Sequence, residues 1–227
     1  MWDEEKSKNA YPSRYKFMDE IAKYLRDEIT ELKKIGVSAI QIDDPNLCLF
    51  VDSAYREKFD DPEMECGHAV RLINSMADGI NGVEIVLHLC RSSGTRNRQK
   101  SMRTSAGFVG KGGYDFILPY LQKLKVSQLA MEFANSDAGC YSVLSHLPKN
   151  VKIGFGCVDV GAGIMDTAET IAKRVENALQ FVNKKRIILN PDCGFAPGNQ
   201  AHVSLDEAYL KLKEMSKAAE LLRKKYE

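Results

Sequence analysis

The clearest structural signal in the sequence is the segment Val83-Glu84-Ile85-Val86-Leu87-His88-Leu89-Cys90. Its apolar start is typical of a strand buried in a sheet, and its end carries two residue types that bind metals. Because side chains alternate across a strand, residues two positions apart point to the same side. We therefore expect His88 and Cys90 to face one point at the carboxyl end of this strand.

Segments typical of strands and helices alternate along the rest of the chain. The expected strands cover residues 39–42, 83–90, 128–133, 151–158 and 186–189. The expected helices cover residues 15–35, 62–77, 113–124, 166–182 and 204–223. Asp166 with Glu169, and Ser204 with Glu207, have the spacing of capping boxes that open the last two helices. Five βα units in a row predict a parallel sheet with the helices outside it.

Every expected strand ends in residues that can take part in chemistry. These residues are Asp43, His88 with Cys90, Glu132, Asp159 and Cys193. Function at the carboxyl ends of strands is common to barrels and to open doubly wound sheets. After the first strand, Asp44-Pro45-Asn46 stands where a dinucleotide-binding fold would carry a glycine-rich loop, and this favours an α/β barrel. A complete (β/α)8 TIM barrel has eight strands and about 250 residues, so we expect a single domain over residues 1–227 with only five βα units.

Length, charge and cysteine content bound the class of protein. With 227 residues and a formal net charge of +1, the chain suits one soluble domain and offers no bulk charge for a nucleic-acid or membrane partner. No apolar stretch reaches the roughly 20 residues of a membrane-spanning helix, and the acidic start is unlike a signal peptide. Six scattered cysteines indicate reduced thiols, so we expect a cytoplasmic location.

A second cysteine near a strand end, Cys193, joins His88 and Cys90 at the same edge of the predicted sheet. Taken singly, the histidine could be a core or surface residue, and each cysteine a small buried apolar residue. Together, one imidazole and two thiolates from separate strand ends favour a metal site. This donor set suits Zn²⁺.

Five motifs, in order along the chain, resemble one family. They are Tyr11-Pro12-Ser13-Arg14, Ile40-Gln41-Ile42-Asp43-Asp44-Pro45, His88-Leu89-Cys90-Arg91, Met131-Glu132-Phe133 and Asn190-Pro191-Asp192-Cys193-Gly194-Phe195. Together they look like the catalytic domain of cobalamin-independent methionine synthase, and most like the short single-domain branch of that family. The resemblance implies a (β/α)8 barrel, of which this chain matches the last five units and lacks the first three.

The resemblance also implies a metal site and a reaction. The implied zinc ligands are His88, Cys90, Glu132 and Cys193. The implied reaction is zinc-dependent methyl transfer to an activated thiol such as homocysteine, in methionine biosynthesis, from a donor of the folate or methylcobalamin type. Asp192, beside the last ligand, is expected to orient ligands through hydrogen bonds.

Further residues are expected near the substrate. Asp43 matches the family's aspartate for the amino group of homocysteine, with a capping role as the alternative. Asp44 and Asp137 could share substrate binding or cap a helix. Arg91 begins a basic segment, residues 91–111, which is expected either to recognise an anionic substrate or to form a solvated loop.

Two departures from the family pattern bear on function. Gly161 stands where the synthases carry a histidine thought to donate a proton, and the lacking units contribute contacts to homocysteine and folate. A five-stranded sheet also has two open edges. We therefore expect either a truncated gene product or edges that a second copy or a companion chain covers.

Other functions stay open at this point. The acceptor could be another thiol, such as coenzyme M, or the chain could be a catalytically silent zinc-binding or scaffold subunit. A metal-free decarboxylase of the related uroporphyrinogen type has no need for His88, Cys90 and Cys193 together. We therefore favour the thiol methyltransferase.

Overall fold

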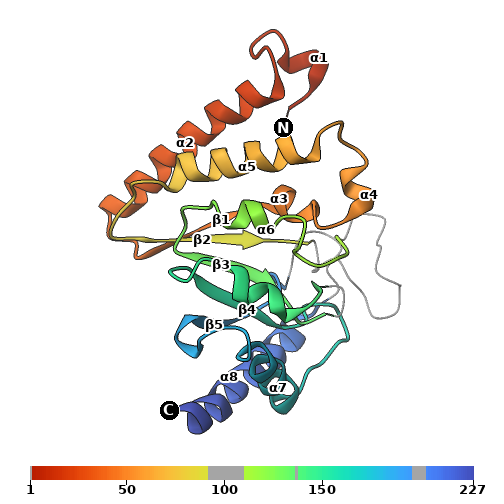
Figure 1. Cartoon of the computed structure of the whole chain (residues 1–227). Coiled ribbons are helices and arrows are strands. Elements are labelled where there is room, and N and C mark those ends of the chain that lie inside the picture. The colour runs from red at the N-terminus through yellow and green to blue at the C-terminus, as the bar shows by residue number, and fades with distance from the viewer. Residues whose placement is uncertain (1, 92–109, 136–137, 196–202) are drawn as a thin grey trace.

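The computed structural model describes all residues except 1, 92–109, 136–137 and 196–202. Its centre is a parallel sheet of five strands in the order β1-β2-β3-β4-β5 (Figure 1). The strands are β1 (Ala39–Asp43), β2 (Glu84–Leu89), β3 (Gln128–Glu132), β4 (Lys152–Val158) and β5 (Ile187–Pro191). All five expected strands are thus confirmed.

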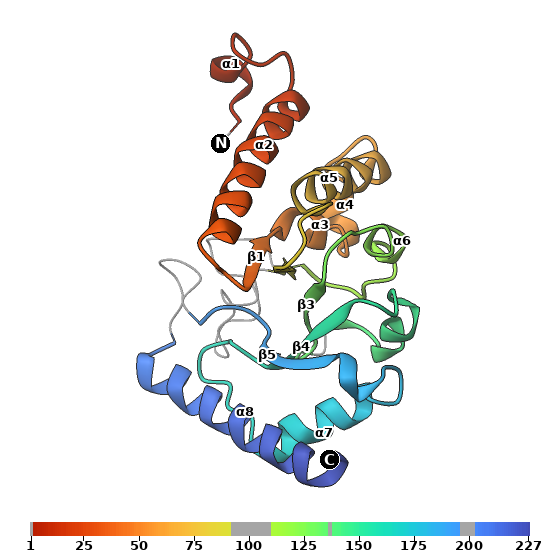
Figure 2. The ribbon, with the colours of Figure 1, turned by 90° about the vertical axis from the view of Figure 1, so that its left-hand side faces the viewer.

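The strand order identifies the barrel type of α/β fold. Each strand pairs with the next one in the sequence, so every crossover advances in the same direction around the sheet. A doubly wound sheet would instead reverse direction at its switch point. Figure 2 shows the strands as an arc with α5, α6 and α7 on its outer side, which is the arrangement of a barrel sector.

Two pairs of helices pack together, one pair near each end of this arc (Figure 2). Helix α2 (Arg14–Lys34) packs against α5 (Pro62–Ala77), and α7 (Ala168–Ala178) packs against α8 (Leu205–Tyr226). The shorter helices are α1 (Glu4–Ser7), α3 (Pro45–Leu49), α4 (Ser53–Arg56), α6 (Leu118–Leu121), and the 3-10 turns η3 (Tyr141–His146) and η4 (Lys184–Arg186). Among the described helices, none is long and apolar enough to cross a membrane.

Two helix predictions need correction. The helix expected over residues 113–124 is only the four-residue α6, because the preceding segment turns inward and buries Tyr114. Helix α7 is capped by Thr167, whose side chain accepts the N–H of Thr170. Asp166, the expected cap, instead pairs with Arg174 on the same helix. Ser204 does cap α8, by accepting the N–H of Glu207.

The register brings the strand ends to one level. Asp43 lies beside His88, and Glu132 lies beside Gly156. On β4, Phe155 belongs to the hydrophobic core beneath the helices, whereas Gly154 and Gly156 on either side of it face the inner side of the arc. The lack of a Cβ at these positions makes room for the side chains of Gln128, Asn190 and Asp192.

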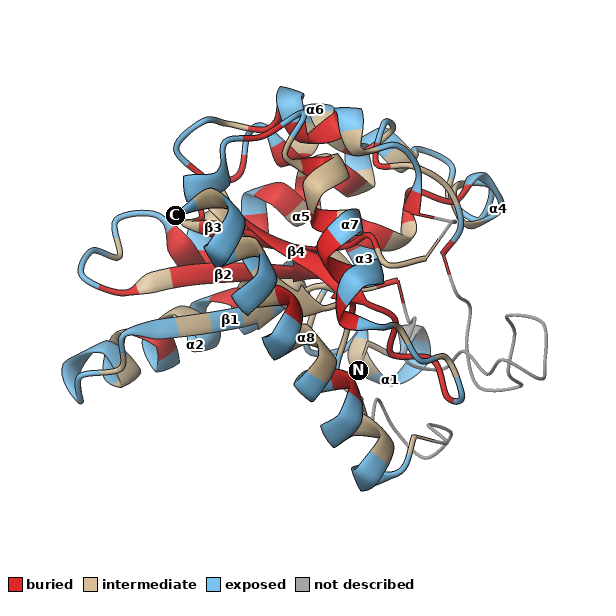
Figure 3. Ribbon diagram, turned by 90° about the horizontal axis from the view of Figure 1, so that it is seen from below, coloured by how far each residue is buried: buried red, intermediate tan, exposed pale blue. Residues whose placement is uncertain are grey.

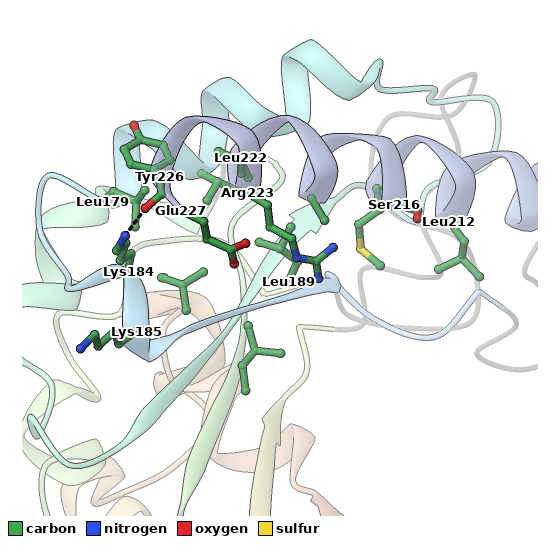
Figure 4. Close-up of a pocket in the computed structure, with 15 residues that line it drawn as sticks. Leu179, Lys184, Lys185, Leu189, Leu212, Ser216, Leu222, Arg223, Tyr226 and Glu227 are labelled. Carbon is green, nitrogen blue, oxygen red and sulfur yellow. Dashed lines mark hydrogen bonds between the residues drawn. The ribbon is translucent and has the colours of Figure 1, made fainter.

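Burial differs between the middle and the edges of the sheet (Figure 3). Every residue of β3 is buried, whereas β1 and β5 consist of exposed and half-buried residues. Beside β5, an apolar groove of about 830 Å³ is lined by Leu189 of β5 and by Leu212 and Leu222 of α8 (Figure 4). The two edge strands are therefore less covered than the middle of the sheet.

Candidate metal centre

Four side chains converge at the carboxyl ends of three strands. One ligand atom from each of His88, Cys90, Glu132 and Cys193 can be chosen so that all four lie within 4.8 Å of one another. His88 and Glu132 belong to β2 and β3 and are buried, whereas Cys90 and Cys193 follow β2 and β5 and are partly exposed. The fold therefore brings together the four residues that the sequence suggested as ligands.

The two cysteine sulfurs of this cluster influence each other directly. Cys90 Sγ lies 3.5 Å from Cys193 Sγ. A hydrogen bond from Cys90, assisted by His88, lowers the pKa of Cys193 to about 5. Burial lowers the pKa of His88, but the neighbouring Cys193 raises it and the net shift is upward. A thiolate and an imidazole are thus held next to each other.

The donor set fits a zinc ion on an observation independent of the sequence pattern. His88 Nε2 is buried and makes no hydrogen bond within the described part of the chain. A buried ring nitrogen without a partner is costly, and coordination of a cation would satisfy it. One imidazole, two thiolates and one carboxylate form a donor set that Zn²⁺ accepts.

Asp192 links the end of β5 to the end of β3. Its Oδ1 accepts the N–H groups of Phe133 at 2.9 Å and Ala134 at 3.0 Å, and its Oδ2 accepts from the Asn135 side chain at 3.2 Å. A Cβ atom at Gly156 would collide with this carboxylate, so the glycine lets Asp192 reach across β4. Burial, with a further contribution from Glu132, raises the pKa of Asp192.

The two adjacent aspartates after β1 have different environments. Asp43 is exposed, accepts a hydrogen bond from Gln41 Nε2 at 2.8 Å, and lines the pocket at the strand ends. Asp44 caps α3 by accepting the N–H groups of Asn46 and Leu47, and burial raises its pKa. The structure thus gives Asp44 the capping position. Asp137 lies outside the described residues.

Arg91 does not point into the pocket. Its side chain is buried, donates to the carbonyl of Gly112 and stacks over the Tyr114 ring at 4.2 Å. Its backbone N–H donates to the Glu132 carboxylate, and Arg91 is not among the residues that line the pocket at the strand ends. A substrate-binding residue was expected to lie in that pocket. Most of the basic segment, residues 92–109, lies outside the described residues.

The loop after β4 is held by a buried lysine. Gly161, the residue at the position of the family's histidine, donates its N–H to Asp159 at 2.8 Å. Lys211 of α8 donates to the carbonyls of Asp159, Gly161 and Ile164. No local pattern indicates this contact, because the lysine follows the loop by about 50 residues along the chain.

The pocket next to the four ligand candidates has a volume of about 530 Å³. Three of these candidates line it, namely His88, Cys90 and Cys193. Asp43 and the amide residues Gln41, Gln128 and Asn190 line it as well. Gln128 and Asn190 were not among the site residues expected from the sequence. Their even spacing from Glu132 and Asp192 on strands β3 and β5 is the signal that could have placed them on the inner face.

Comparison with known proteins agrees with this geometry. Residues 7–221 match the family model described as the catalytic domain of cobalamin-independent synthase. The chain is 29% identical over 217 residues to a methionine synthase of Pyrococcus horikoshii, covering 96% of this chain and 53% of that protein. It is 29% identical over 218 residues to the methionine synthase of Thermococcus kodakarensis, covering 94% and 52%.

A solved structure is similar over nearly the same extent. The B12-independent methionine synthase of Shewanella sp. W3-18-1, in complex with selenomethionine, superposes with a TM-score of 0.73 at 26% identity. The match covers 95% of this chain and 57% of that one. The chain thus spans about half the length of the relatives that it matches. From its motifs, its fold and the match over residues 7–221, this chain belongs to the cobalamin-independent synthase family, as a catalytic-domain member.

Proposed function

We propose that the chain is a zinc-dependent methyltransferase domain that moves a methyl group to a thiol, as in the last step of methionine synthesis. The observation that carries the proposal is the convergence of four ligand atoms within 4.8 Å of one another at the strand ends. His88, Cys90, Glu132 and Cys193 would hold the metal. Membership of the family supports the methyl transfer.

When bound, zinc would keep a substrate thiol deprotonated at a pH where a free thiol, with a pKa of about 8.5, is mostly protonated. The thiolates and the carboxylate of the chain would keep the site electron-rich, so that the substrate sulfur stays nucleophilic toward a methyl group. The pocket lined by Asp43, His88 and Asn190 would hold the body of the substrate beside the proposed metal.

We assign the recognition of the substrate amino group to Asp43. Its carboxylate is exposed to the pocket, it is positioned by Gln41, and its strand register sets it beside His88. The Shewanella relative holds selenomethionine, the selenium analogue of the product that methyl transfer to homocysteine would give. A homocysteine-like thiol is therefore the acceptor that we propose, with a folate or methylcobalamin type of donor.

We further propose that additional parallel βα units cover the two edges of the sheet. Strands β1 and β5 each pair with one neighbour among the described strands, and the relatives are about twice as long as this chain. A complete barrel has eight strands, three more than the described part of this chain supplies. Size-exclusion chromatography with mass determination tests this. A second copy gives a dimer, a companion polypeptide co-purifies, and a stable, well-folded monomer contradicts the proposal.

A cytoplasmic location is also part of the proposal. The six cysteines are all free thiols in the structure, which suits a reducing compartment. Fractionation of cells that produce the chain would test the location.

Metal analysis followed by a donor assay tests the function. The purified chain should contain about one zinc per molecule and should form methionine from homocysteine when a methylfolate or methylcobalamin is supplied. Zinc without any methyl transfer to homocysteine or to coenzyme M would favour a silent scaffold subunit. Methyl transfer to coenzyme M alone would change the acceptor. A chain that does not bind zinc would contradict the proposal.

A further inference from the structure

The end of β3 carries Glu132 beyond the reach of its neighbour β2. The pairing of β2 with β3 ends at Leu89 and Met131, one residue before Glu132. On the other side, Phe133 donates its N–H to Gly156 of β4 at 3.1 Å. Because the backbone groups of consecutive strand residues point to opposite sides, the N–H and C=O of Glu132 face the side that β2 has left.

A single side chain, Tyr114, takes the place of the departed strand. Its hydroxyl accepts the N–H of Glu132 at 2.9 Å and donates to the carbonyl oxygen of Glu132 at 3.2 Å. One hydroxyl supplies one donor and two acceptor sites, so it can serve both backbone groups at once. Tyr114 is almost fully buried, and no water is needed to satisfy this end of β3.

The neighbours of Tyr114 fix its position. The Arg91 guanidinium lies 4.2 Å from the centre of its ring, and the Phe133 ring contacts it at 5.4 Å between centroids. The backbone N–H of Arg91 donates to Glu132 Oε1 at 2.8 Å. Residues 91 and 114 therefore hold both the backbone and the carboxylate of Glu132.

We infer that Tyr114 is a positioning residue for the Glu132 carboxylate, holding it beside His88, Cys90 and Cys193 for metal binding. This inference rests on the proposed function, since it assigns to Tyr114 a role in zinc affinity. Hydrogen bonds that orient a ligand from behind commonly contribute about 10- to 100-fold to metal affinity. The loss of the Tyr114 hydroxyl should have an effect of that size.

A double-mutant cycle in the full chain tests the inference. Zinc affinity is measured by competition with a chromophoric chelator for the wild type, Tyr114→Phe, Glu132→Gln and the double variant. We expect Tyr114→Phe to weaken zinc binding by roughly 10- to 100-fold alone and to add no loss in the Glu132→Gln background. Tyr141→Phe is the matched control, because Tyr141 packs on Phe133 and Phe155. It should leave zinc affinity unchanged.

Each outcome of the cycle decides a different statement. Equal losses in both backgrounds, or no loss at all, would overturn the positioning role while leaving the proposed function intact. A wild-type chain that binds no zinc would overturn both. If Tyr114→Phe does not fold by circular dichroism, Arg91→Lys goes through the same cycle, because it removes the stacked guanidinium but retains the hydroxyl. Arg91→Lys should then weaken zinc binding by a smaller factor, and only in the chain that retains Glu132. Equal losses of zinc affinity in the chain with Glu132 and in the Glu132→Gln variant again overturn the inference.

Discussion

Strands β3 and β5 each deliver one proposed metal ligand, but the surrounding protein holds them very differently. β3 is buried throughout and pairs on both sides, with β2 and with β4. β5 pairs with β4 among the described strands, and 39% of Ile188 is exposed. The proposed metal centre therefore joins a buried ligand in the middle of the sheet to one at a less covered edge.

Removal of either proposed sulfur ligand should have the largest effect on zinc content and on methyl transfer. Cys90→Ala and Cys193→Ala are each expected to abolish stoichiometric zinc and methyl transfer, because each variant removes one of the two soft thiolate donors of the site. Zinc content by atomic emission and product formation are the measurements. Cys140→Ala, at an exposed free thiol, is the control. Full zinc occupancy in both ligand variants would refute the ligand assignment.

Truncation of a buried side chain in the middle of the sheet should lower stability more than truncation of a side chain on an edge strand. Met131 of β3 is completely buried, so Met131→Ala should lower the free energy of unfolding by about 2–5 kcal/mol. Ile188→Ala on β5 should cost about 1 kcal/mol or less, since much of that side chain already contacts solvent. Urea unfolding followed by circular dichroism measures both. Equal losses would mean that the edge is covered in solution.

The cross-strand reach of Asp192 can be tested at the glycine beneath it. In Gly156→Ala the new Cβ would lie 2.5 Å from the Met131 carbonyl oxygen and would collide with Asp192. We expect a loss of about 1–3 kcal/mol in unfolding free energy, together with weaker zinc binding. Gly67→Ala inside α5 meets nothing within 4 Å and should instead raise stability by up to about 1 kcal/mol. If Gly156→Ala leaves both the free energy of unfolding and the zinc affinity unchanged, the Asp192 contacts are contradicted.

Removal of zinc should have the smallest and most local effect. A chelator takes away the link between the middle and the edge, so amide exchange should become faster in Ile187–Pro191 and stay nearly unchanged in Gln128–Glu132. Hydrogen exchange with mass spectrometry would resolve the two peptides. Uniform acceleration across both strands would mean that the metal holds the whole sheet together.

The strands, and the meeting of their carboxyl ends at one edge of the sheet, could be predicted because both follow from local apolar runs. All five strands begin or end within about two residues of their expected limits. Glu132 needed the family resemblance, because an acidic residue at a strand end is common without a metal. The helix predicted over residues 113–124 was wrong, because the residues before Leu118 form a turn in which Tyr114 is buried.

The supporting contacts could not be read from the sequence at all. The hydrogen bonds of Tyr114 exist because β2 leaves the sheet one residue before β3 ends, and this depends on register. Asp192 reaches Phe133 only because Gly156 lies between them in space, 36 residues from one and 23 from the other along the chain. Such contacts are properties of the assembled sheet, so local patterns do not reveal them.

The consecutive strand order has a consequence for how the protein is made. A nascent chain leaving the ribosome can add each βα unit to the one before it, since no strand waits for a later one to lie between its neighbours. His88, Cys90 and Glu132 would then emerge and assemble well before Cys193 is synthesised. A metal held by all four proposed ligands could therefore bind only after Cys193 has been translated.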